Sequence, residues 1–181
     1  MRVIYSREMN FSLPGAIEVL KQTPRTLEAM LKDLSPEWYE SSSDQENWNP
    51  FDTLGHLIHG EKTDWIPRAE IILAQGENRT FVPFDRLAQF RDSGGESLFD
   101  LLAEFKSLRD TNLDQLKGWN LTAEQLALKG AHPELGEVSL EQLIATWTVH
   151  DLNHIRQIVT RMAARYTDDV GPWRKYLSIL T

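Results

Sequence analysis

Four long segments of this 181-residue chain repeat apolar residues at intervals of three and four, and this spacing constrains the fold more than any other feature. Residues at such intervals lie on one face of an α-helix, so each segment is predicted to be an amphipathic helix. The predicted helices cover Leu13 to Leu34, Asn49 to Gln75, Glu96 to Lys117 and Ser139 to about Arg165. No convincing strand alternation appears. Four long helices predict an all-α four-helix bundle.

Local signals mark the ends of these helices. Asn49 is a predicted N-cap that precedes a proline, and Ser139 has the spacing of a capping box with the glutamine three residues later. Gly76 and Gly118 are predicted to end the second and third helices. Pro24 falls inside the first helix, where we expect a kink or a break.

The connections between the predicted helices are long. A polar loop covers residues 35–48, and a longer one covers residues 76–95. Between the third and fourth helices, a short capped turn ("TAEQ") precedes "KGAHPELGEV", which is predicted to be a small hairpin or an ordered turn. Loops of this length inside a compact domain are often functional. We expect one domain over residues 1–181 with long inter-helix loops.

Charge and composition exclude several classes of protein. The formal net charge is −8 with no dense basic patch, which disfavours nucleic-acid binding because phosphate contacts need Lys and Arg. There is no cysteine, which excludes disulfides, cysteine-based zinc sites and a cysteine nucleophile. We find neither a signal-like apolar segment at the amino terminus nor a run long enough to span a bilayer, so we expect a cytoplasmic protein with no membrane partner.

The segment "TWTVHDLNHIRQI" places two histidines four residues apart on the fourth predicted helix. At about 100° per residue, His150 and His154 fall in the same sector as the apolar residues, so both are predicted to point into the bundle. Such a pair offers two imidazole nitrogens to one metal ion. The alternative is two buried neutral histidines that are hydrogen-bonded to other helices.

The second predicted helix offers candidates for a third ligand. His56 projects nearly opposite the apolar stripe of this helix, and on amphipathicity alone it is predicted to face solvent. A stagger of about 10 Å along the bundle would separate His56 from the histidine pair if the helix ends were aligned. Glu61 falls on the apolar side and is a rival carboxylate ligand. The residues alone leave both alternatives open.

"HDLNH" is similar to the HExxH motif of zinc proteases, but aspartate replaces the glutamate that would act as base. A protease is therefore disfavoured. The chain also lacks a G-x-S-x-G elbow, a P-loop and a G-x-G-x-x-G motif.

Taken together, these motifs resemble the DinB/YfiT-like superfamily of metal-binding four-helix bundles. The resemblance spans about Leu13 to Met162. It depends on "TPRTLEAMLKDL", "WNPFDTLGHLIHGE", "FVPFDRLAQF" with "SLFDLLAEFKSLR", and most specifically "HPELGEVSLEQLIATWTVHDLNHIRQI". The ordered set of a Gly-His-Leu histidine followed by His-x-x-x-His is much more specific than either part.

The resemblance implies a divalent metal, typically zinc or nickel, held by three histidines. The ligands of the family fall on His56, His150 and His154, all of which are present. His59 lies outside that pattern and is interpreted as a surface residue or one that supports the ligands, and His132 is interpreted as a loop residue. The resemblance also allows a homodimer.

Several relatives of this kind transfer low-molecular-weight thiols. The resemblance therefore implies a metal-dependent transferase that conjugates a small thiol to a small electrophile, since an ion with open positions ionises a bound thiol. Asp151 and Gln157 are candidates for orienting the imidazoles. The alternatives are a small metal-dependent hydrolase with the same histidines, a non-enzymatic metal or ligand binder, and a bundle without metal.

Overall fold

The structure is a computed structural model, and it describes residues 10–41 and 44–180. The segment from which we predicted the absence of a signal sequence lies mostly outside the described residues, as do both ends of the domain predicted over residues 1–181.

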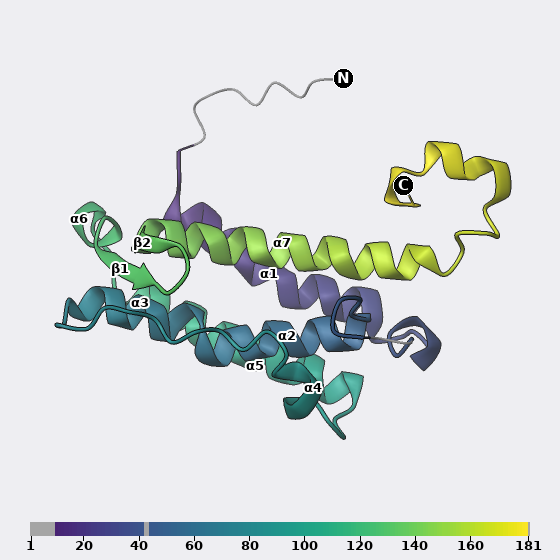
Figure 1. The fold of residues 1–181 in the computed structure, drawn as a ribbon, viewed down its shortest axis with the longest axis horizontal. Coiled ribbons are helices and arrows are strands. Elements are labelled where there is room, and N and C mark those ends of the chain that lie inside the picture. The colour runs from purple at the N-terminus through teal and green to yellow at the C-terminus, as the bar shows by residue number, and fades with distance from the viewer. Residues whose placement is uncertain (1–9, 42–43, 181) are drawn as a thin grey trace.

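Helices dominate the described chain, and two short strands pair as a hairpin (Figure 1). In chain order the elements are α1 (Leu13–Leu31), the 3-10 helix η1 (Pro36–Trp38), α2 (Pro50–Thr63), α3 (Trp65–Ala74), α4 (Gln89–Asp92), α5 (Leu98–Gly118), α6 (Ala123–Leu126), β1 (Lys129–His132), β2 (Gly136–Ser139), α7 (Leu140–Ala164), and the 3-10 helices η2 (Gly171–Tyr176) and η3 (Ser178–Leu180). The predicted all-α four-helix bundle is confirmed.

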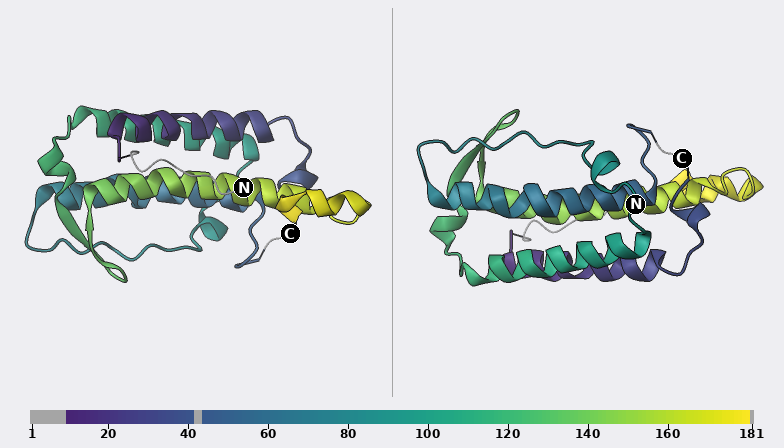
Figure 2. Two further views of the ribbon diagram at one scale, coloured as in Figure 1. Left: turned by 90° about the horizontal axis from the view of Figure 1, so that it is seen from above. Right: turned by 90° about the horizontal axis from the view of Figure 1, so that it is seen from below.

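The four long rods of the bundle are α1, α2 continued by α3, α5, and α7. Both α1 and α2 pack against α5 and α7, so α1 lies diagonally opposite α2. The colour gradient in Figure 1 shows that α1 and α7 run in one direction, whereas α2–α3 and α5 run in the other. Because the rod of α2 and α3 runs parallel to α5, and α2 packs against α5, the connection between α3 and α5 must return along the whole bundle. Figure 2 shows this connection extended along the outside of α2 and α3.

The second predicted helix is interrupted at Asp64, which separates α2 from α3. Pro67 explains this interruption, because its ring lacks an N–H and clashes with the carbonyl four residues earlier, which belongs to Thr63. The helical direction continues past the interruption, since the N–H of Arg68 donates to the carbonyl of Asp64 over 3.0 Å. The end predicted at Gly76 comes one residue earlier, where Gln75 has a left-handed φ of 47°.

Several other local predictions are tested directly. The capping box at Ser139 is present at the start of α7, and "KGAHPELGEV" contains the antiparallel hairpin of β1 and β2. Helix α1 continues through Pro24, so the break expected there is not found. This helix ends at Leu31 rather than at Leu34, and α5 begins after the N-cap Ser97.

The core is divided into two apolar clusters along the bundle axis. One cluster contains Trp65 and Trp147, and the other contains Leu54 and Phe105. On each long rod a short polar stretch separates the two clusters, and on α5 this stretch contains Arg109, which is fully buried. A layer of buried charge therefore crosses the middle of the bundle. None of the described helices is long and apolar enough to cross a membrane.

Candidate metal centre

The two histidines of α7 lie one helical turn apart and point into the bundle, as their spacing predicted. Their Nε2 atoms are 3.0 Å apart. The side chain of His154 is buried, whereas that of His150 is partly exposed to a cavity beside α7. Since α7 is a regular helix through this region, the four-residue spacing is enough to bring both rings together.

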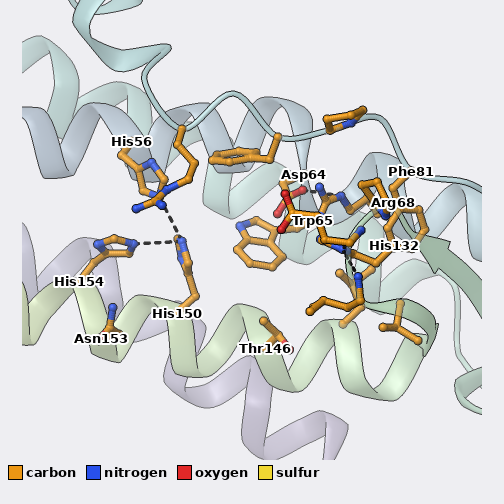
Figure 3. A pocket seen from close by; sticks show the side chains of 18 of the residues that line it. His56, Asp64, Trp65, Arg68, Phe81, His132, Thr146, His150, Asn153 and His154 are labelled. Carbon is orange, nitrogen blue, oxygen red and sulfur yellow. Dashed lines mark hydrogen bonds and ion pairs between the residues drawn. The ribbon is translucent and has the colours of Figure 1, made fainter. Parts of the chain in front are cut away.

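His56 completes the cluster from α2. Its Nε2 lies 3.2 Å from Nε2 of His150, and one nitrogen of each of the three rings lies within 4.8 Å of the other two (Figure 3). The stagger expected from aligned helix ends is not found, because α7 extends well beyond the start of α2 (Figure 1). Among the described residues, these three histidines form the only group whose placement suits a metal ion.

The prediction that His56 faces solvent is wrong, because its side chain is only 4% exposed. The connection between α3 and α5 covers this side of α2, and the ring of Phe84 lies 5.3 Å from the imidazole of His56. Trp48, just before α2, lies 4.7 Å away. The neighbouring Gly55 permits this cover, since a Cβ there would overlap Oγ of Ser93. Amphipathicity within α2 alone does not reveal a covering segment from elsewhere in the chain.

The three imidazoles are held in the neutral form. Burial, with smaller contributions from His154 and His150, lowers the pKa of His56 to about 2. Burial also lowers the pKa of His150 to about 3 and shifts the pKa of His154 in the same direction. Neutral imidazole is the form that binds metals, because only then does a ring nitrogen present a lone pair.

Hydrogen bonds support Nε2 as the metal-facing atom of His154. Its Nδ1 lies 2.9 Å from Oε1 of Gln157, which is an acceptor, so Nδ1 donates the proton and Nε2 keeps its lone pair. The contact predicted between Gln157 and an imidazole is therefore present. The Nδ1 atoms of His56 and His150 are buried and have no hydrogen-bond partner among the described residues.

The donor set fits a divalent ion of the zinc type. Such an ion binds imidazole nitrogen at about 2.0–2.1 Å, so ligands of one ion stand about 3.0–3.4 Å from each other. The distances from His150 to His154 and to His56 lie within this range. Three neutral ligands on one side also leave open coordination positions, as in catalytic rather than structural sites.

A cavity of about 1020 Å³ opens beside the histidines, between α7, α2–α3, the connection after α3 and the hairpin. Figure 3 shows the histidines at one end and Arg68, Phe81 and His132 at the other. The ring of Trp65 lies 5.0 Å from that of His150 and forms part of the wall between the two ends. The cavity is large enough for a drug-sized molecule or for two smaller ones.

Glu61, the rival ligand, is excluded from the cluster by its own contacts. One carboxylate oxygen of Glu61 accepts hydrogen bonds from Arg109 at 2.8 Å and from Trp147 at 3.0 Å, and the other accepts one from Asn112 at 3.0 Å. The prediction that Asp151 orients an imidazole is also wrong, since both of its oxygens bind Arg109, at 2.6 and 3.1 Å. These residues form the buried polar layer behind the histidines.

The two remaining histidines lie outside the cluster. His59 is on α2 and has its Nδ1 3.6 Å from a carboxylate oxygen of Asp92, next to the ring of Phe84. His132 is the last residue of β1, not a loop residue, and its Nδ1 accepts from two backbone N–H groups of the hairpin turn. It lines the far end of the cavity.

Sequence reasoning missed Arg109 and the residues of the connection that enclose the site. Arg109 carries a visible signal, because it follows Phe105 by four residues on the apolar stripe of α5. A single cation on a buried face requires anionic partners, although the sequence does not show which carboxylates these are. Phe84 and Arg86 line the cavity, and nothing local in "FVPFDR" indicates which helix they cover.

This chain is similar in sequence and in fold to known proteins. The sequence model of the DinB superfamily matches residues 20–158, which include all three clustered histidines. A solved structure of YfiT from Bacillus subtilis is similar over 89% of this chain and 92% of that chain, with a TM-score of 0.71 and 20% sequence identity. YfiT is described as a probable metal-dependent hydrolase with an unusual four-helix bundle topology. A search of curated proteins found no match.

Proposed function

The chain belongs to the DinB superfamily, and from this premise and the three facing imidazoles we propose a divalent-metal-dependent enzyme that acts on a small molecule. His56, His150 and His154 are the proposed ligands, and zinc or nickel is the proposed metal. The observation that carries this proposal is the convergence of three neutral ring nitrogens at the end of a large cavity.

The proposed reaction is the transfer of a low-molecular-weight thiol to a small electrophile. When bound, the ion would lower the pKa of a thiol that reaches one of its open positions. The buried carboxylates near the histidines are otherwise engaged, since Glu61 and Asp151 bind Arg109 and Asp64 binds Arg68. A thiol whose pKa is lowered by the ion needs no strong base from the protein. Of the reactions considered, thiol transfer therefore requires the fewest catalytic side chains.

The chain contributes positioning and exclusion of water. Gln157 fixes the orientation of His154, while Trp48 and Phe84 pack against the ring of His56. The cavity volume supports two reactants side by side, because about 1020 Å³ lies at the upper end of the range for single small ligands.

Hydrolysis is the second candidate, and the description of YfiT as a probable metal-dependent hydrolase favours it. The same open positions would then serve a water molecule instead of a thiol. A cytoplasmic location and a homodimer also belong to the proposal; exposed Val149 and Leu152 on the outer face of α7 support the dimer.

Metal content is the first test. Elemental analysis of tag-free protein should give about one zinc or nickel per chain, and His154→Ala should reduce this to background, whereas His59→Ala should not. Stable wild-type protein that retains no metal and binds none on addition would refute the metal centre.

The reaction class is tested next, with a panel of thiols and a chromogenic electrophile, in the presence and absence of metal. A rate that requires both metal and thiol supports transfer. Metal-dependent cleavage of ester or amide substrates without thiol would favour hydrolysis instead.

A further inference from the structure

Charged side chains that line the cavity differ in whether their charge is compensated. Arg68 lies at the end away from the histidines, and its Nε is 2.5 Å from a carboxylate oxygen of Asp64. Both side chains are almost completely buried. Burial raises the pKa of Asp64 to about 6, but Arg68 offsets part of that effect. The two opposite charges therefore neutralise each other, and the pair offers little net charge to a ligand.

Arg86 is the uncompensated cation of the cavity. It lies on the connection between α3 and α5, is exposed, and lines the cavity together with His56 and His154. Its neighbour Asp85 binds Arg91 instead, at 2.7 Å. Within the part of the chain that the structure describes, Arg86 has no hydrogen bond and no ion pair. A guanidinium without a partner at the wall of a cavity is available to an anion.

Two carboxylates, Glu46 and Glu134, also line the cavity. Within the described part of the chain, neither of them forms an ion pair with Arg86.

Two amide side chains add hydrogen-bond donors to the same region. The Oε1 atom of Gln157 accepts from His154, so its NH₂ group is left for another partner. Likewise, Oδ1 of Asn153 accepts from Arg156, which leaves the NH₂ group of Asn153. Figure 3 shows Asn153 beside His150 and His154 at the cavity. Two amide NH₂ groups are thus available to a ligand beside the histidines.

We propose that Arg86 is a specificity-determining residue that binds a carboxylate group of the substrate, while the apolar body of that substrate packs against Trp65 and Phe84. This inference rests on the proposed function, because it names the substrate class of the same cavity. A singly charged carboxylate suits one guanidinium better than a doubly charged phosphate monoester does, since Glu46 and Glu134 at the same cavity would repel the second charge. The planar guanidinium also matches a carboxylate with two parallel hydrogen bonds.

The test uses 3-phenylpropionate and its uncharged amide, which share an aromatic body and differ in charge. Binding of each is followed by nuclear magnetic resonance, with the indole N–H signals of Trp48 and Trp65 reporting on the cavity. Titrations are made on metal-loaded and on chelator-treated wild type, on Arg86→Gln, and on Arg79→Gln. Arg79 is a matched control, because it lies on the same connection, loses the same charge and does not line the cavity.

We expect wild type to bind the carboxylate about tenfold more tightly than the amide. This preference should persist without metal, weaken with added salt, disappear in Arg86→Gln and remain in Arg79→Gln. An equal preference in Arg86→Gln and wild type would overturn the proposal, as would a preference that vanishes on chelation, because the ion alone would then hold the anion. Failure of the metal centre is a separate result, since it is measured by elemental analysis on the same samples.

Discussion

Replacing Arg109 with methionine should cause the largest loss of stability of any single charge removal in the bundle. The guanidinium is fully buried where α1, α2, α5 and α7 meet. It donates to the carbonyl of Leu20 at 2.7 Å, to both carboxylate oxygens of Asp151, and to Glu61. Methionine keeps most of the apolar stem and lacks the guanidinium, whose carbon lies 5.0 Å from the centroid of the Phe105 ring. The change therefore removes mainly charge and hydrogen bonds.

The magnitude follows from what remains in the core. Arg109→Met leaves two carboxylates, Glu61 and Asp151, without their shared cation in a region with no exposed surface. Breaking a buried ion pair by removing one partner costs about 3–5 kcal/mol, and this site has two such pairs. Burial raises the pKa of Glu61, with Arg109 opposing that shift, so protonation of Glu61 should relieve part of the loss at lower pH. The loss should therefore be larger at about pH 8 than at about pH 5.

Urea unfolding followed by circular dichroism measures this loss, provided that the denaturant slope stays unchanged. Lys106→Met is the matched control, because Lys106 is an exposed cation on the same helix, paired with Asp110. It should change the free energy of unfolding by no more than about 0.5 kcal/mol. The triple variant with Arg109→Met, Glu61→Gln and Asp151→Asn should recover part of the loss, since it buries no unpaired charge.

A loss below about 1 kcal/mol for Arg109→Met, or one no greater than that of Lys106→Met, would refute the reasoning. So would a triple variant that is less stable than Arg109→Met alone. Either result would mean that the carboxylates do not depend on the buried cation.

Two further predictions concern the histidines. Burial lowers the pKa of His56 to about 2 and of His150 to about 3, whereas a histidine in the unfolded chain has a pKa of about 6.5. As the pH falls below about 6.5, the two histidines are therefore protonated in the unfolded chain but not in the folded protein. Metal-free protein should therefore be most stable above about pH 6.5, and its free energy of unfolding should fall by roughly 1 kcal/mol or more per pH unit below that pH. Urea unfolding at about pH 7.5 and about pH 5.5 measures this difference. Greater stability at the lower pH would contradict the prediction. Gln157→Leu removes the acceptor of the Nδ1 proton of His154 and should weaken metal affinity about 10–100-fold in chelator competition; unchanged affinity would show that this hydrogen bond does not orient the ring.

The sequence was sufficient for several features that depend on a single helix. The capping box at Ser139 and the four-residue spacing of His150 and His154 determine the start of α7 and the common direction of the two rings. The position of a proline alone was not sufficient, since α1 passes through Pro24 without a break whereas the second helix is interrupted at Asp64, three residues before Pro67.

Features that depend on contacts between distant segments were not accessible in this way. His56 is buried because Phe84 and Trp48 cover it, and neither residue lies on its helix. Arg109 was recognisable as an unusual cation on an apolar stripe, but its partners depend on how α2 and α7 pack around α5. The family resemblance identified His56 as the third histidine. A helical wheel of α2 did not, because the segment that covers His56 comes from the connection between α3 and α5.

The parallel arrangement of α3 and α5 has a consequence for how such a protein diversifies. It requires a connection that returns along the bundle (Figure 2). Phe81, Pro83, Phe84, Arg86 and Leu87 of that connection line one wall of the cavity. The three histidines, by contrast, are borne on α2 and α7. The proposed anchoring of the ion and the proposed selection of the reactant thus belong to separate stretches of chain. A library of variants in residues 81–87 that retains Phe84, which packs against His56, is expected to change the choice of reactant while the histidines stay in place.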